Sequence, residues 1–93
     1  MSAARTVAVA IRGRVQGVGY RAWMRNEARA LGLHGHVRNR PDGSVAAVVS
    51  GEPAAVERLL AACRRGPPGA LVEDVTDTRS TEVPAAGFEI RYA

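Results

Sequence analysis

The sequence predicts an α+β sandwich in which two helices cover one face of an antiparallel sheet, with the element order β-α-β-β-α-β. Three observations predict it. Apolar residues alternate near both ends of the chain, two inner segments carry apolar residues at helical spacing, and a Pro-Asp-Gly-Ser turn lies between those segments. This arrangement is the ferredoxin-like fold, which serves many unrelated functions, so function has to be argued from individual residues.

The first strand is predicted over residues 6–15, because Val7, Val9 and Ile11 alternate with small or charged residues. A Gln-Gly-Val-Gly turn at residues 16–19 separates it from the first helix. That helix is predicted over residues 20–31 and ends before Gly32, since glycine commonly follows the last turn of a helix. Its buried stripe comprises Tyr20, Trp23, Met24, Ala28 and Leu31, with Glu27 at its edge.

Residues 33–40 and 45–50 are predicted to form a hairpin around the turn at 41–44, where Pro fixes φ and Gly accepts a positive φ. The second helix begins at Pro53, a favourable first helical position, and ends near Gly66. After a Pro-Pro-Gly loop, residues 71–78 and 87–92 are the last two strands. The stripe that the second helix buries comprises Val56, Leu59, Leu60 and Cys63.

The length and the cysteine content limit the possible classes of protein. We expect the 93 residues, 1–93, to form a single domain with one core. The single cysteine, Cys63, excludes an intramolecular disulfide and a multi-thiolate metal site, and it fits a reducing compartment. No apolar run approaches the roughly 18 residues that cross a bilayer. We therefore expect a monomeric, cytoplasmic protein without a membrane anchor.

The charge favours an anionic partner. The formal net charge is +4, and all 13 basic residues are arginines. Nucleic acid, phospholipid and a small phosphate all fit this charge, and so does a genome that merely favours arginine codons. Net charge therefore leaves the partner open.

The segment from residue 13 to residue 21 leaves a strand, turns on small residues and enters a helix. Backbone N–H groups of such a turn and of a helix N-terminus favour an anion. Arg21 in the first helical turn opposes the helix dipole, and a bound anion would remove that conflict. The alternative is a tight connection with Arg21 in solvent. The predicted phosphate-binding residues are Gln16, Gly17, Val18, Gly19, Tyr20 and Arg21.

Two other phosphate motifs fit less well. The chain has no lysine, which excludes a Walker-type nucleotide site. Gly17, Gly19 and Ala22 match G-x-G-x-x-A, and Asp42 follows about 20 residues later, as a dinucleotide site requires. The next strand, however, runs into a hairpin instead of a second parallel strand, so this match is weak.

Two segments together resemble one family. Residues 13–21 resemble the G-x-V-Q-G-V-x-[FY]-R signature of acylphosphatases, and residues 35–43 resemble their G-[WF]-V-x-N-x-x-D-G signature. The resemblance implies a metal-independent hydrolase that splits acyl phosphates into a carboxylate and inorganic phosphate, with no cofactor. It implies that the loop and Arg21 bind the phosphoryl group, and that Asn39 holds the attacking water. Inorganic phosphate or sulfate is then a product or inhibitor.

Two positions depart from the family pattern. His36 stands where the family usually has an aromatic residue, which could loosen the packing beside Asn39, and Ala46 stands where an acidic residue is frequent. His34 and His36 lie on one face of a strand without an evident third ligand, so no metal site is predicted. Cys63 lacks the C-x₅-R context of a thiolate phosphatase and is expected in the core.

Two alternatives remain at this point. A non-catalytic phosphate- or RNA-binding module could share the same fold, but RNA-recognition domains present aromatic residues on the sheet, and only 4% of this chain is aromatic. Nucleic acid is therefore not the expected partner. The domain could also be an accessory unit whose substrate is made by a partner enzyme.

Overall fold

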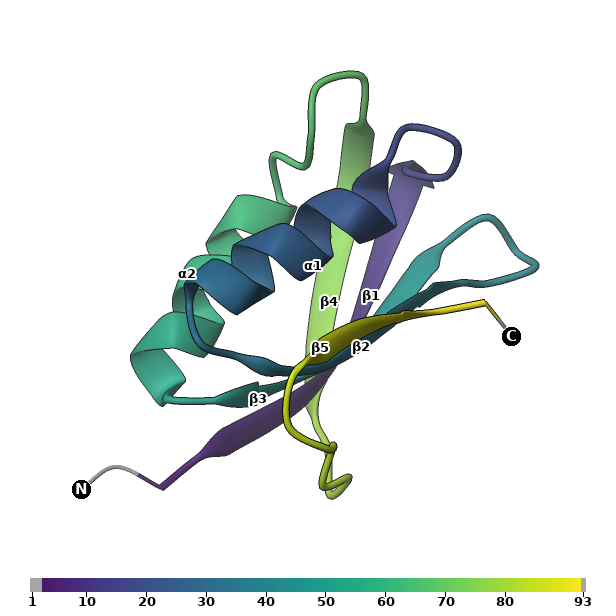
Figure 1. The fold of residues 1–93 in the computed structure, drawn as a ribbon. Helices are drawn as coiled ribbons and strands as arrows, with labels where there is room; N and C mark the ends of the chain where they lie inside the picture. The colour runs from purple at the N-terminus through teal and green to yellow at the C-terminus, as the bar shows by residue number, and fades with distance from the viewer. Residues whose placement is uncertain (1–2, 93) are drawn as a thin grey trace.

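The computed structural model describes residues 3–92 (Figure 1). The predicted order of elements is confirmed, and every predicted strand boundary lies within one residue of the observed one. The elements are β1 (Arg5–Arg14), α1 (Tyr20–Ala30), β2 (His34–Asn39), β3 (Val45–Gly51), α2 (Pro53–Cys63), β4 (Leu71–Arg79) and β5 (Phe88–Arg91).

The five strands form one sheet in the order β4-β1-β3-β2-β5. The prediction of a wholly antiparallel sheet is wrong for one pair, because β5 runs parallel to β2, with Gly35 opposite Phe88 and Val37 opposite Ile90. The reason lies in the connection after β4. It takes the chain across one end of the sheet to the opposite edge, so β5 runs back against the direction of β4 and thus along β2 (Figure 1).

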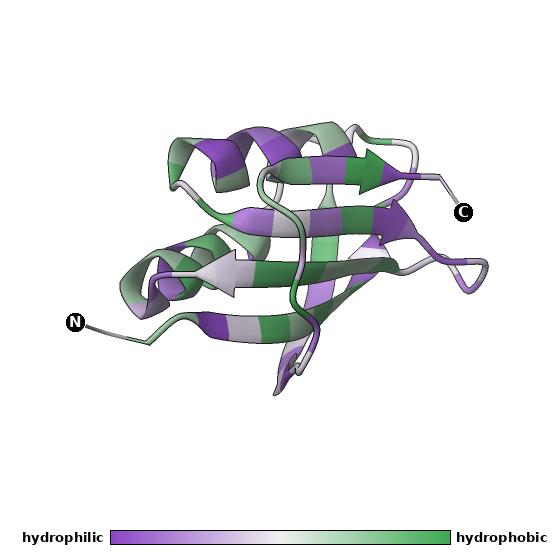
Figure 2. Cartoon of the chain, turned by 60° about the horizontal axis from the view of Figure 1, so that its bottom comes forward, coloured by the Kyte–Doolittle hydropathy of each residue, from purple (hydrophilic) through white to green (hydrophobic). Residues whose placement is uncertain are grey.

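Both helices lie on the same face of the sheet, α1 against β2 and β5, and α2 against β1, β3 and β4 (Figure 1). The core fills the space between the two layers. Figure 2 shows hydrophobic and hydrophilic residues alternating in β5, whereas β3 at the centre of the sheet is largely hydrophobic. The fully buried residues include Ile11, Tyr20, Met24, Val37, Val49, Leu59, Cys63 and Phe88.

A hydrogen bond inside this core joins the two helices. The Tyr20 hydroxyl donates to the backbone oxygen of Cys63 at 2.7 Å. Burial raises the pKa of Tyr20, and burial also raises the pKa of the Cys63 thiol to about 11. Cys63 is thus a protonated core residue, as its helical position predicts. Within residues 3–92, no helix combines the length and apolar character required to cross a membrane.

Candidate functional site

A pocket of about 200 Å³ lies where the loop after β1, the first turn of α1, the end of β2 and the residues around β5 meet. Arg21 and Asn39, which come from the two separate signature segments, both line it. The fold therefore brings the two predicted chemical groups to one place. The remaining lining residues are Val15, Gly17, Gly19, Tyr20, Ala22, Ile90 and Tyr92.

Two glycines give the loop between β1 and α1 its backbone conformation. Gly17 and Gly19 have φ values of +76° and +77°, in the left-handed region that other residues rarely adopt. The first helical hydrogen bond of α1 runs from the Trp23 N–H to the Gly19 oxygen at 3.0 Å. Within residues 3–92, the N–H groups of residues 16–22 donate to no protein acceptor. Such a run of free donors at the positive end of a helix suits an anion with several oxygens.

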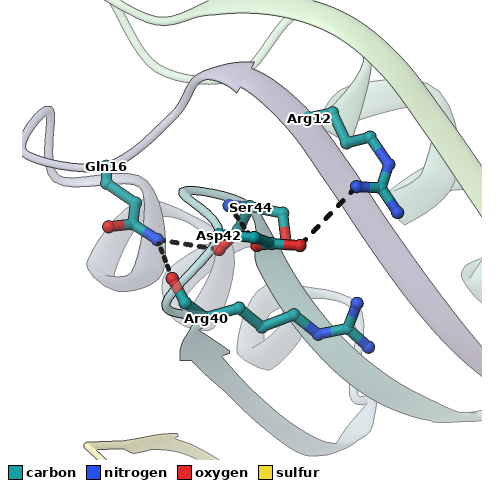
Figure 3. A network of polar contacts seen from close by, with 5 residues as sticks. All are labelled: Arg12, Gln16, Arg40, Asp42 and Ser44. Carbon is teal, nitrogen blue, oxygen red and sulfur yellow. Dashed lines mark hydrogen bonds and ion pairs between the residues drawn. The ribbon is translucent and has the colours of Figure 1, made fainter.

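The Gln16 side chain has a structural task that the sequence did not reveal. Its amide nitrogen donates to the backbone oxygens of Arg40 and Ser44, each at 2.8 Å, so it fastens the loop to the β2–β3 turn (Figure 3). Four of the six predicted phosphate-binding residues line the pocket, namely Gly17, Gly19, Tyr20 and Arg21. Gln16 and Val18 do not belong to the lining, and Val18 packs against the core.

Asp42 stabilises the β2–β3 turn through its side chain. Its Oδ1 accepts hydrogen bonds from the Ser44 hydroxyl at 2.6 Å and the Ser44 N–H at 2.9 Å, and its Oδ2 lies 3.8 Å from an Arg12 nitrogen (Figure 3). These contacts lower the pKa of Asp42, chiefly through Ser44 and less through the charges of Arg12 and Arg40. Asp42 therefore supports the loop through the turn and lies outside the pocket lining.

We expect Asp42 to make the stability of the protein depend on acidic pH. Because its pKa is lower in the folded state than its unfolded value of about 3.9, its contribution is complete above that value and disappears as pH falls through the folded pKa. The Asp42→Asn variant should lose less of its melting temperature than the parent between pH 5 and pH 2.5. The exposed Asp74→Asn variant is the control, and equal pH slopes for the parent and Asp42→Asn would contradict the assignment.

Arg21 and Asn39 are both free to act on a ligand. Arg21 is half-buried, and in the described part of the chain no carboxylate lies within 4 Å of its guanidinium. The guanidinium carbon instead lies 5.0 Å from the centroid of the Tyr92 ring. Asn39 is the last residue of β2, and its side-chain amide has no hydrogen-bond partner among residues 3–92. A guanidinium and an amide that are both unpaired within the described part of the chain thus border the same cavity.

The two histidines lie away from this pocket. His36 Nε2 lies 2.7 Å from an oxygen of Glu82, and His34 Nδ1 accepts a hydrogen bond from the Gly87 N–H at 2.9 Å. Both rings thus fasten the β4–β5 connection to β2. His36 is three residues from Asn39 on the same strand, so the two side chains point to opposite faces of the sheet. The described residues contain no group of three or more side chains that could hold a metal ion.

A larger hollow of about 260 Å³ lies on the open face of the sheet. Its lining includes the small residues Ala8, Ala10 and Ala46 and the basic residues Arg38 and Arg40. In the described part of the chain, no aromatic residue other than His36 lines it, so these residues offer no platform for stacking nucleic-acid bases. This weakens the alternative of an RNA-binding sheet.

Comparisons with known proteins agree on one family. The family model described as Acylphosphatase matches residues 7–90. The chain is 55% identical over 76 residues to an acylphosphatase of Acidiphilium cryptum, covering 82% of this chain and 84% of that protein. It is 51% identical over 88 residues to an acylphosphatase of Azorhizobium caulinodans, covering 95% and 94%. The solved structure of an acylphosphatase from Coxiella burnetii is similar with a TM-score of 0.91 at 32% identity, covering 95% of this chain and 93% of that one.

Proposed function

The chain belongs to the acylphosphatase family and is an acylphosphatase, and for its own residues we propose that the loop at 16–21 and Arg21 bind the phosphoryl group while Asn39 holds the attacking water. One observation carries this proposal. Within residues 3–92, free N–H donors, a guanidinium without a carboxylate partner and an unpaired amide border one cavity of about 200 Å³. The donors would bind the phosphoryl oxygens, and their strength would increase as negative charge develops on those oxygens.

The proposed reaction is a displacement at phosphorus. The water oxygen forms a bond to phosphorus, and the bond between phosphorus and the carboxylate oxygen breaks, with the electron pair leaving on the carboxylate. A guanidinium offers only N–H donors and a carboxamide is not basic, so neither Arg21 nor Asn39 supplies a base. The water proton then passes to a phosphoryl oxygen of the substrate.

This mechanism selects the substrate by its leaving group. The proposed site supplies no acid to assist departure, so the bond to phosphorus must break without help. A carboxylate is a stable leaving group, whereas the alkoxide of a sugar phosphate is far more basic and leaves much more slowly. Positioning and electrostatic stabilisation are therefore sufficient for an acyl phosphate.

We also propose that the enzyme acts as a monomer in the cytoplasm. A single buried thiol, Cys63, agrees with a reducing compartment. Within residues 3–92, the strongly exposed large hydrophobic side chains belong to three separate segments, namely Leu71 at the start of β4, Val83 in the β4–β5 connection and Tyr92 after β5. This agrees with a monomer, because oligomer interfaces usually present a contiguous apolar patch.

Inorganic phosphate is expected to inhibit hydrolysis of benzoyl phosphate competitively and to raise the melting temperature. A ligand that binds only the folded state at about 100 times its Kd stabilises it by about 2.7 kcal/mol. Inhibition should persist in the presence of a chelator, because no metal is part of the proposed site. Chloride at equal ionic strength is the control, since phosphate could also screen the excess of arginines. The proposed binding loop is wrong if saturating phosphate changes neither the rate nor the melting temperature.

A further inference from the structure

Tyr92 occupies an unusual place for a large aromatic residue. It follows β5, where Phe88 is fully buried and Ile90 is packed at the edge of the core, yet 82% of Tyr92 is exposed to solvent. The exposed residue is not remote from function, because Tyr92 lines the same pocket as Arg21 and Asn39. Phe88, Ile90 and Tyr92 follow one another at every second position, so this face of β5 begins in the core and ends at the border of the active-site pocket.

The contact between Tyr92 and Arg21 offers a reason for that position. The guanidinium carbon lies 5.0 Å from the ring centroid, a distance typical of a cation–π interaction. A carboxylate would also orient Arg21, but it would neutralise the charge and compete with the phosphoryl group for the same N–H donors. An aromatic ring orients the guanidinium through one face and leaves its edge, with all its donors, available to the ligand.

The lining of the pocket divides into two chemically different parts. Gly17, Gly19, Arg21 and Asn39 contribute N–H donors, whereas Val15, Ile90 and Tyr92 contribute apolar surface. When the phosphoryl group lies against the donors, the acyl group has to extend toward the apolar part or into solvent. Among residues 3–92, no charged side chain other than Arg21 lines the pocket, so a second charge on the acyl group would find no partner among them.

We propose that Tyr92 is a positioning and specificity-determining residue. Its ring holds the Arg21 guanidinium toward the phosphoryl group, and the same ring forms an apolar wall that favours acyl phosphates with an aromatic or other bulky apolar acyl group. This inference rests on the proposed function, because it needs the phosphoryl group to bind at Arg21.

The test compares Tyr92→Ala, Tyr92→Leu and Tyr92→Phe with benzoyl phosphate and acetyl phosphate as substrates. In Tyr92→Ala we expect the inhibition constant of inorganic phosphate to rise about three- to tenfold, because Arg21 loses its cation–π contact. Separately, the ratio of kcat/KM for benzoyl phosphate to kcat/KM for acetyl phosphate should fall about fivefold, since an aromatic contact to the acyl group is lost. Tyr92→Phe keeps the ring and should restore both values to within about twofold of the parent.

The leucine variant separates the two roles. Tyr92→Leu keeps an apolar wall without an aromatic face, so it should weaken phosphate inhibition as Tyr92→Ala does while retaining part of the benzoyl preference. Val83→Ala, which removes another highly exposed hydrophobic side chain outside the pocket lining, is the matched control and should change neither value.

The outcomes distinguish this inference from the proposed function. If phosphate inhibits the parent competitively but Tyr92→Ala leaves the inhibition constant and the substrate preference unchanged, the role of Tyr92 is wrong and the site stands. If phosphate does not inhibit the parent at all, the proposed phosphate site is wrong, and the role of Tyr92, which rests on it, is wrong as well. Melting temperatures verify that each variant is folded at the assay temperature, and Tyr92→Phe reports on the ring even if the smaller side chains destabilise the protein.

Discussion

Replacing Arg21 with Ala is expected to lower kcat/KM for benzoyl phosphate by about 10³-fold or more and to remove inhibition by inorganic phosphate. Arg21 has no carboxylate partner within residues 3–92, so its donors are available to the phosphoryl oxygens. Losing one neutral donor to a developing oxyanion typically costs about 10²- to 10³-fold, and arginines that stabilise phosphoryl transfer are worth about 10³- to 10⁵-fold. Arg21→Lys keeps the charge but loses the planar fork, so an intermediate rate is expected.

The melting temperature of Arg21→Ala, unlike its activity, should not fall. A positive charge in the first turn of α1 is unfavourable beside the positive end of the helix dipole, so Arg21→Ala should keep or raise the melting temperature without phosphate. Arg25→Ala removes the same charge one turn further along α1, outside the pocket lining, and serves as the control. Activity close to that of the parent in Arg21→Ala, with phosphate inhibition intact, would contradict the assignment of Arg21 as the phosphate ligand.

Much of the fold could be predicted because its signals are local. The alternation of Val7, Val9 and Ile11 reflects the pleat of a half-buried strand, and all three are buried in β1. The direction of β5 could not be predicted in the same way. Its own residues alternate equally well in a parallel or an antiparallel pair, and its direction depends on the edge to which the β4–β5 connection takes the chain.

The candidate site was partly predictable for a similar reason. The loop at 16–19 and Arg21 could be assigned from neighbouring glycines and the start of a helix, whereas the role of Asn39 came from the resemblance alone. The side-chain partners of Gln16 could not be foreseen, because they are backbone oxygens of Arg40 and Ser44, 24 and 28 residues further along the chain. The contact of Tyr92 with Arg21 joins residues even further apart.

The pairing of His36 with Glu82 shows how a long-range contact changes the meaning of a substitution. A histidine in place of the usual aromatic residue suggested looser packing beside Asn39. His36 is instead 8% exposed, and its ring is held by Glu82 from the β4–β5 connection. Its side chain occupies the face of the sheet opposite to that of Asn39, so the packing beside Asn39 does not depend on it.

Replacing Asn39 with Ala is expected to lower kcat by about 10²- to 10³-fold while leaving the inhibition constant of inorganic phosphate within about threefold of the parent. In the proposed mechanism Asn39 orients the water, and this contributes in the transition state without contributing to phosphate affinity. Its side chain has no hydrogen-bond partner among residues 3–92, so its removal leaves no polar group unpaired and the melting temperature should change little. Asn26→Ala, an exposed asparagine on α1, is the control.

Asn39→Asp makes the comparison decisive, because it keeps the shape of the side chain and adds a possible base. If the reaction needed only a general base at this position, the carboxylate would preserve or raise kcat as it titrates. If the amide only positions water, the negative charge added in Asn39→Asp would repel the phosphoryl group. Its kcat should then fall, and inorganic phosphate should inhibit it less strongly. Loss of phosphate inhibition in Asn39→Ala as severe as in Arg21→Ala would show that Asn39 binds phosphate directly, and the division of roles between the two residues would then be wrong.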